Sequence, residues 1–213
     1  MIPRPTGSLR AAPPRRATQP GPPARRKVEA LFGGSFDPVH LGHLVVAETL
    51  ADVLGVTVRF LPAREQPFKH AAHAASPEQR AEMLALAVAG NPRFRVERVE
   101  LELPTPSYTV RTLRALAGRE PGNRFVLLLG ADAAGDLPNW YEVEALPHLA
   151  DVVAFARPGS ELRAHGLIGR VVTVPALDIS ATAVRERVAQ GRSIRYLVSD
   201  PVREYIGAHR LYR

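Results

Sequence analysis

Residues 28–54 combine three features that strongly restrict how this chain can fold. Residues 28–32 form a short apolar run that reads as a buried β-strand, and the pair Gly33-Gly34 follows it directly. From residue 44 to residue 54, apolar side chains recur at helical spacing. The pair Asp37-Pro38 suits a helix start, with the aspartate as N-cap and the proline in the first turn. The segment therefore predicts a strand, a glycine turn and a helix in direct succession.

Two histidines make this turn suitable for an anion. A helix N-terminus offers unpaired N–H groups and a partial positive charge, and glycines let a ligand approach the backbone closely. His40 and His43 are three residues apart, which places both imidazoles on one face of the expected helix, where each can donate to a phosphate oxygen. The alternatives are capping or packing histidines and a zinc site. No third zinc ligand lies nearby and the chain has no cysteine, so the pattern favours phosphate.

Strands and helices are expected to alternate along the chain. The segments that read as strands are 28–32, 56–61, 125–129, 151–156 and 171–174, with 94–96 and 99–102 read as one bent strand. Helices are expected at 44–54, 77–88, 109–116, 182–190 and 201–208, and Ser76 followed by Pro77 suits the start of the second. Such alternation predicts an α/β, Rossmann-like, doubly wound fold with a mostly parallel sheet and helices on both faces.

The positive charge of the chain is concentrated at its N-terminus. Its net charge is +7, and the first 27 of its 213 residues hold seven basic residues and no acidic one: Arg4, Arg10, Arg15, Arg16, Arg25, Arg26 and Lys27. Residues 1–26 are also rich in proline and poor in large apolar side chains, so we expect a disordered tail before one domain at 27–213. Because the charge belongs to the tail, no nucleic-acid-binding face is expected. With no cysteine and no long apolar run, we expect a cytoplasmic protein without a membrane segment.

A second anion site is expected near the C-terminus. In residues 179–185, Ser180 or Thr182 can cap the helix that follows, and Arg185 lies one turn into it. Hydroxyls, free helix N–H groups and a guanidinium on one face together suit a phosphate. Taken alone, this is an ordinary helix start with a surface arginine, and the glycine turn is what favours the functional interpretation.

Both strings resemble the nucleotidyltransferase family that joins a nucleoside monophosphate to a phosphorylated acceptor. Residues 33–43 resemble its phosphate-binding signature, which ends in His-x-Gly-His, and differ from a Walker loop and from the Gly-x-Gly-x-x-Gly fingerprint. Residues 179–185 are similar to the family's Ile-Ser-x-Thr-x-x-Arg segment, with Ala181 where many members have serine. These two motifs identify the superfamily and give no information on the acceptor.

Four middle segments resemble the bacterial nicotinate-nucleotide adenylyltransferases in order and spacing. They are Pro67-Phe68-Lys69, Ser107-Tyr108-Thr109, Gly130-Ala131-Asp132 with Leu137 and Trp140, and Arg157-Pro158-Gly159. With a C-terminal pattern at residues 197–212, the resemblance covers nearly all of residues 27–213. Trp140, the only tryptophan, lies in the polar segment 136–141, where a packing role and a stacking role on a pyridinium are both open.

The resemblance implies adenylyl transfer from ATP to nicotinate mononucleotide, with Mg²⁺ bound mainly through the ATP phosphates and no metal ligands from the protein. It implies a catalytic role for His40, His43 and Arg185. The ATP or phosphate contacts carried over are Gly33, Gly34, Ser35, Phe36, Lys69, Ile179, Ser180 and Thr182. The mononucleotide contacts carried over are Ser107, Tyr108, Thr109, Asp132, Trp140, Tyr141 and Arg157.

Three other interpretations stay open at this point. One is an adenylyltransferase of the same superfamily that acts on nicotinamide mononucleotide or on phosphopantetheine. Another, from a different class, is a nucleotide-binding regulator without catalysis, which would be expected to lack one of the phosphate ligands. A third is nucleic-acid binding through the arginine-rich tail. The sequence gives no oligomeric state, and a homo-oligomer is compatible with it.

Overall fold

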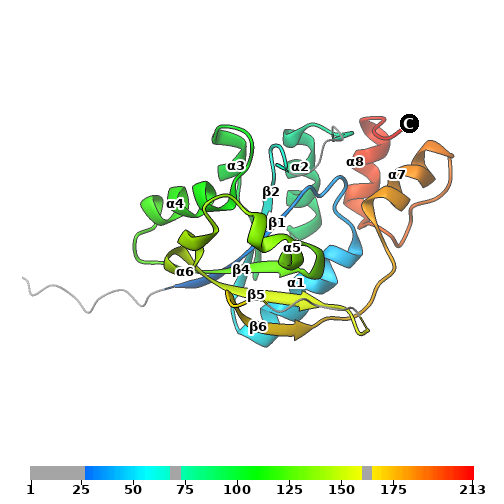
Figure 1. Ribbon diagram of the computed structural model, residues 1–213. Helices are drawn as coiled ribbons and strands as arrows, with labels where there is room; N and C mark the ends of the chain where they lie inside the picture. Colours follow the sequence, from blue (N-terminus) through cyan, green and yellow to red (C-terminus); the bar gives the residue numbers. More distant parts are fainter. Residues whose placement is uncertain (1–26, 68–72, 160–164) are drawn as a thin grey trace, which may run out of the picture.

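A computed structural model describes residues 27–67, 73–159 and 165–213 (Figure 1). At its centre is a six-stranded sheet in the order β3-β2-β1-β4-β5-β6, and every pairing between these strands is parallel. The strands are β1 (Val28–Gly34), β2 (Thr57–Pro62), β3 (Phe94–Val96), β4 (Arg124–Gly130), β5 (Ala150–Ala156) and β6 (Ile168–Thr173). This confirms the predicted doubly wound α/β fold.

Helices cover both faces of the sheet. The longer ones are α1 (Leu41–Leu54), α2 (Pro77–Val88), α4 (Thr109–Arg119), α7 (Ala181–Ala189) and α8 (Asp200–Ala208). Short helical segments are α3 (Val99–Glu102), α5 (Ala131–Asp136), α6 (Leu146–Leu149) and the 3₁₀ turns η1 (Leu137–Asn139) and η2 (Val143–Ala145). In Figure 1, the C-terminal α8, in red, lies beside α2, as their direct contacts also show.

Side-chain alternation along the strands explains the two layers. On β1, Ala30 and Phe32 pack into one apolar cluster with α1, α2, α7 and α8, whereas Leu31 packs into a second cluster with α4, α5 and α6. On β4, Val126 and Leu128 belong to the first cluster, and the alternate residues Phe125, Leu127 and Leu129 belong to the second. Because successive side chains of a strand point to opposite faces, a continuous apolar run is what a sheet covered on both sides requires.

Local signals placed some elements well and others poorly. The helix at residues 77–88 has the predicted bounds, and Ser76 caps it by accepting from the N–H of Gln79. The predicted bent strand at 99–102 is wrong, because this segment forms α3, with Val99 and Glu100 buried. Four residues that alternate apolar and acidic fit a period of 2 and one helical turn almost equally. The short elements α5, η1, η2 and α6 were not predicted; α5, η1 and α6 each contain a glycine or a proline, which is typical of a loop.

The predicted N-cap at Asp37 is also wrong. Helix α1 begins at Leu41, and His40, with an extended backbone, is its N-cap residue. Asp37 is 4 % exposed, and its carboxylate accepts from the backbone N–H groups of Ala74 (2.8 Å) and Ala75 (3.2 Å). Its donors are therefore supplied by the loop before α2. The second cap prediction is confirmed for Ser180, which accepts from the N–H of Ala183.

The strand order reverses between β1 and β4. From β1 the chain builds the sheet outward through β2 to β3, and from β4 it builds the other side through β5 to β6. In open α/β sheets, ligands bind at such a switch point, beyond the carboxyl ends of the strands. Residues 33–40, here called the glycine loop, comprise the last two residues of β1 and the segment that leads to α1 at this point. Among the described residues no helix has the length and apolar character needed to cross a membrane. The tail predicted at residues 1–26 lies outside the described residues.

Candidate active site

Two pockets open at the carboxyl ends of the central strands. The basic pocket has a volume of about 810 Å³, and its basic lining residues are His40, His43, His73, Arg157 and Arg185. The aromatic pocket has a volume of about 380 Å³, and its lining includes Tyr108, Trp140 and Tyr141. The two pockets share Phe32, Gly34, Gln66, Gly130, Asp132 and Ala133, so they form one continuous cleft at the switch point.

The two histidines lie face to face at the start of α1. Their rings are stacked with centroids 3.7 Å apart, and the backbone N–H of His40 donates to Nδ1 of His43 at 3.3 Å. An accepting Nδ1 carries no hydrogen, so the neutral tautomer of His43 has its hydrogen on Nε2. The buried ring of Phe36 meets His43 edge-on, with centroids 5.0 Å apart, and holds its orientation.

His40 is neutral in this environment. It is 6 % exposed, and burial lowers its pKa to about 4, with a further contribution from the positive charge of Arg157. Its Nδ1 is buried and has no hydrogen-bond partner among the described residues. Without a ligand, the neutral imidazole of His40 offers one hydrogen-bond donor at the helix N-terminus and no full charge. Anionic oxygens bound in the pocket would raise the pKa of His40, because a nearby negative charge favours the protonated form.

Two glycines of this segment are required by close contacts. A Cβ at Gly42 would lie 3.0 Å from Nδ1 of His40, and a Cβ at Gly34 would lie 3.0 Å from the ring of Phe36. Both distances are shorter than ordinary van der Waals contact, so any larger residue would displace the neighbouring ring. The glycine between the two histidines therefore leaves room for the imidazole of His40.

Arg185 reaches the glycine loop from α7. Its Nη1 donates to the backbone carbonyl of Asp37 at 2.7 Å, and its Nη2 donates to Oγ1 of Thr182 at 3.2 Å. The guanidinium thus lines the same pocket as both imidazoles, although 142 positions separate it from His43. The fold thus brings residues of the two anion-binding strings into one pocket.

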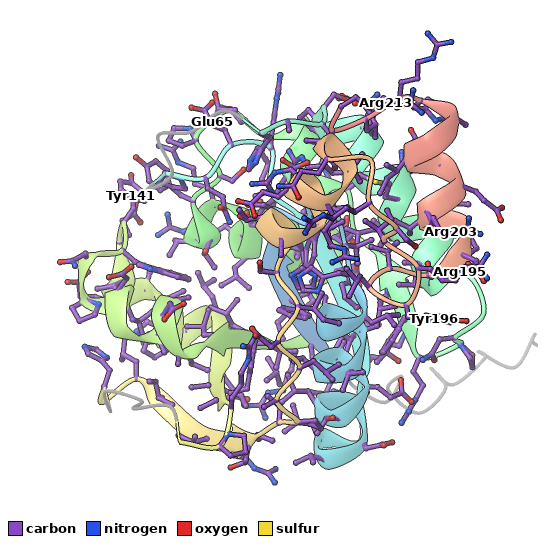
Figure 2. All side chains as sticks on the ribbon, turned by 90° about the vertical axis from the view of Figure 1, so that its right-hand side faces the viewer. Glu65, Tyr141, Arg195, Tyr196, Arg203 and Arg213 are labelled. Carbon is purple, nitrogen blue, oxygen red and sulfur yellow. The ribbon has the colours of Figure 1, made fainter. Side chains whose placement is uncertain are left out.

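The aromatic pocket is walled by stacked rings. Tyr108 and Tyr141 stack with centroids 4.5 Å apart, and Cζ of Arg111 lies 4.8 Å from the first ring centroid and 5.2 Å from the second. In Figure 2, Tyr141 lies at the side of the molecule opposite Arg203 of α8. Trp140 packs against the second apolar cluster, which confirms its packing role, and it also lines the pocket, where stacking on a pyridinium stays a prediction.

Acidic groups balance these rings. Glu100, Asp132 and Asp136 line the aromatic pocket, and within the described chain neither lysine nor arginine is part of this lining. Burial raises the pKa of Glu100, whose carboxyl group accepts from the hydroxyl of Thr112 at 3.0 Å. Helix α4 starts at the same pocket, and no side chain caps its N-terminus. Its first N–H groups are thus oriented toward a ligand or water.

Most of the predicted site residues line one of the two pockets. The basic pocket contains Gly34, Ser35, Phe36, His40, His43, Asp132, Arg157, Ile179, Ser180, Thr182 and Arg185. The aromatic pocket contains Gly33, Gly34, Ser107, Tyr108, Thr109, Asp132, Trp140 and Tyr141. Arg157, grouped with the mononucleotide contacts by sequence, thus lies on the basic side. Lys69 falls outside the described residues.

Sequence reasoning missed several lining residues. Gln66 lines both pockets and accepts from the hydroxyl of Ser35 at 2.7 Å. Glu100 and His73 also belong to the linings. None of the three lies in a motif with a recognisable spacing, and the topology alone brings them to the cleft.

Known proteins resemble the chain over most of its length. Residues 31–187 match the cytidylyltransferase-like family. A protein of Roseiflexus castenholzii named "Probable nicotinate-nucleotide adenylyltransferase" is 46 % identical over 194 residues, covering 86 % of this chain and 96 % of that protein. One of Thermus thermophilus with the same name is 47 % identical over 184 residues, covering 86 % and 98 %.

Solved structures share the fold at low identity. The nicotinic acid mononucleotide adenylyltransferase of Plasmodium falciparum, complexed with NaAD, aligns with a TM-score of 0.70 and 18 % identity over 88 % of this chain and 98 % of that one. Its complex with APC aligns with a TM-score of 0.68. On the family match and the sequence identities, this chain belongs to the cytidylyltransferase-like family, and within it to the nicotinate-nucleotide adenylyltransferases.

Proposed function

We propose that the chain transfers the adenylyl group of ATP to nicotinate mononucleotide, giving nicotinate adenine dinucleotide and pyrophosphate, a step of NAD biosynthesis. The observation that carries this proposal is the continuous cleft, in which a basic pocket meets an aromatic and acidic one. A triphosphate and a pyridinium nucleotide need just these two environments side by side. The names of the relatives support the same reaction.

The basic pocket is suited to the triphosphate of ATP. The N-termini of α1 and α7 both face it, with His40 and Ser180 as their N-cap residues. Backbone N–H groups, imidazole N–H groups and the guanidinium of Arg185 can donate to phosphate oxygens from several directions. We assign Arg185 and α7 to the β and γ phosphates, and the histidines to the α-phosphate region.

The aromatic pocket is suited to the mononucleotide. The indole of Trp140 offers an electron-rich face to the cationic pyridinium ring, and the surrounding carboxylates favour the same charge. The uncapped N-terminus of α4 at Thr109 offers N–H groups to the carboxylate of nicotinate. Asp132, which lines both pockets, is placed to accept from ribose hydroxyls. The position of Arg157 in the basic pocket supports a contact with the phosphate of the mononucleotide.

The chemistry needs alignment more than proton transfer. An oxygen of the mononucleotide phosphate attacks the α-phosphorus of ATP, the new P–O bond forms, and the bond to the bridging oxygen breaks as pyrophosphate leaves. The attacking phosphate is already ionised at neutral pH, so no general base is required. His43 donates to the α-phosphoryl oxygens as charge develops there, and Arg185 holds the leaving pyrophosphate.

Magnesium fits this site as a companion of the nucleotide. Among the titratable side chains that line the basic pocket, the five imidazole and guanidinium groups outnumber the two carboxylates of Asp37 and Asp132, so the lining suits phosphate oxygens better than a bare metal ion. Magnesium usually keeps several waters and binds substrate phosphates directly. When bound, it would offset negative charge on the triphosphate. Asp132 lines this pocket, and its carboxylate would accept hydrogen bonds from the waters that Mg²⁺ keeps.

The test compares three acceptors with ATP and Mg²⁺: nicotinate mononucleotide, nicotinamide mononucleotide and phosphopantetheine. Pyrophosphate release is measured for each. We expect the highest kcat/KM with nicotinate mononucleotide, and a Trp140→Ala variant that loses this preference while its KM for ATP stays within twofold. A higher kcat/KM with either other acceptor would overturn the substrate assignment. Binding of ATP with no turnover of any acceptor would favour a nucleotide-binding regulator.

A further inference from the structure

The end of the chain returns to the glycine loop. After α8, the chain continues through Leu211, which is buried, to Tyr212, which packs against the first apolar cluster. The hydroxyl of Tyr212 donates to Oδ1 of Asp37 at 2.7 Å across 175 positions of sequence. The final residue, Arg213, is exposed at the outer edge of the molecule beside α8 (Figure 2). The penultimate side chain is therefore turned inward, toward the site.

Asp37 connects three distant segments. Its carboxylate accepts from Tyr212 and from the backbone N–H groups of Ala74 and Ala75, while its backbone carbonyl accepts from Arg185 at 2.7 Å. A buried carboxylate is stable only when its oxygens are hydrogen-bonded. The hydrogen bond from Tyr212 therefore helps to fix the position of Asp37, and with it the backbone carbonyl of Asp37 that accepts from Arg185.

Other contacts support the loop from below. Arg80, with no exposed surface, donates to the carbonyl of Ser35 at 2.6 Å, and the first N–H of α1, at Leu41, donates to the carbonyl of Leu197 at 2.9 Å. Because these contacts keep the loop folded, loss of a single hydroxyl at Tyr212 should move Asp37 locally rather than unfold the segment.

We propose that Tyr212 is a positioning residue for ATP: through Asp37 it fixes the backbone carbonyl that orients Arg185 over the basic pocket. This rests on the proposed function only in taking the triphosphate as the ligand of that pocket. Burial and the neighbouring Asp37 carboxylate raise the pKa of the Tyr212 phenol, which keeps it a donor at neutral pH. Tyr212 is part of neither pocket lining, so its influence on ATP passes through Asp37 and Arg185.

The test is Tyr212→Phe in the full chain, which keeps the packed ring and removes only the hydroxyl. We expect the KM for ATP to rise about tenfold, the loss of one hydrogen bond to a charged group, with the KM for nicotinate mononucleotide unchanged within twofold. The matched control is Tyr205→Phe, the same change on α8. Its ring stacks on His209, with centroids 3.9 Å apart, and we expect both KM values to stay as in the parent chain.

Direct binding separates this proposal from the proposed function. Calorimetry with α,β-methylene ATP, without acceptor, should show a Kd about tenfold higher for Tyr212→Phe, whatever acceptor the protein uses. In the background of Asp37→Asn, the same substitution should add less than twofold, because both changes break one chain of contacts. An unchanged Kd would overturn the proposal. Equal rises in both KM values together with a lower Tm would also overturn it, in favour of a purely structural role.

Discussion

The two pockets of the cleft are built in different ways. The basic pocket joins the glycine loop to α7, segments near opposite ends of the described chain, and offers helix N-termini and cationic side chains. The aromatic pocket is lined chiefly by residues 100–141, which include β4, and offers stacked rings and three acidic side chains. The first lining suits a phosphate charge that many nucleotides share, whereas the second suits a flat ring.

This difference decides what each pocket demands of the sequence. A site made of backbone N–H groups needs glycines where side chains would collide, and Gly34 and Gly42 are such positions. A site made of packed rings depends on which side chains the fold brings together, as with Tyr108, Arg111 and Tyr141. The first kind leaves a compact signature, and the second is dispersed along the chain.

The largest expected effect on activity comes from removing the imidazole of His43 in the basic pocket. If the basic pocket stabilises charge that develops during transfer, His43→Ala should lower kcat by about 10²- to 10³-fold, as for loss of one donor to a developing oxyanion. The Kd of ATP should change far less. Steady-state kinetics with nicotinate mononucleotide and calorimetry with α,β-methylene ATP measure the two quantities.

His209→Ala serves as the control, since His209 follows α8 and is exposed. It should leave kcat unchanged within twofold. If His43→Ala weakened ATP binding as much as it lowered kcat, the imidazole would be a ground-state ligand only, and the pocket would merely hold the triphosphate.

The same contrast explains how far the sequence could predict this molecule. The strand, glycine turn and histidines were recognisable because each answers a local backbone need. The helix at 77–88 was placed correctly because Ser76 and Pro77 mark its start. Asp37 was misassigned as a cap because its real donors, at residues 74, 75 and 212, come from contacts that no local pattern encodes.

The aromatic side was less predictable for a physical reason. Resemblance pointed to Ser107, Tyr108 and Trp140, but no spacing indicated that Gln66 would line both pockets or that Arg111 would lie against two rings. Short helices such as α5 and α6 form because they pack against β4 and β5, not because their own residues favour a helix. Tertiary packing determines these features.

The buried imidazole of the basic pocket gives a pH prediction of intermediate size. The pKa of His40 is lowered to about 4 in the folded protein, against an ordinary value of 6.5. Between these values the unfolded chain binds a proton at this residue and the folded chain does not. The free energy of unfolding should therefore fall as the pH is lowered, by about 2 kcal/mol between pH 7 and pH 5 from this group.

Urea unfolding of the parent chain and of His40→Asn at both pH values measures this contribution as a difference. Every other histidine is common to the two proteins and cancels. The variant should lose about 2 kcal/mol less than the parent on acidification. Identical losses would mean that residue 40 is not a neutral, buried imidazole in the folded state.

The smallest expected effect lies in the aromatic pocket. It separates the two pockets, because Arg111 contacts the rings of the aromatic pocket and is not part of its lining. Its guanidinium lies over both Tyr108 and Tyr141. Each such contact stabilises by about 0.5–1 kcal/mol at an exposed site. Arg111→Ala should therefore raise the KM for nicotinate mononucleotide about three- to tenfold and leave the KM for ATP unchanged within twofold.

Trp140 gives this prediction a second readout, because it is the only tryptophan and adjoins Tyr141. If Arg111 holds the wall, its loss should change the indole emission before any substrate is added. Arg119→Ala, at the far end of α4 and paired with Glu102 at 2.7 Å, should change neither quantity. An unaltered emission with an unaltered acceptor KM would show that the stacked tyrosines keep their position without Arg111. A rise in the KM for ATP would show that the effect of Arg111 is not confined to the aromatic pocket. If His43→Ala has the large effect expected above, a weak response to Arg111→Ala would mean that packed rings tolerate the loss of a neighbour better than phosphate ligands do.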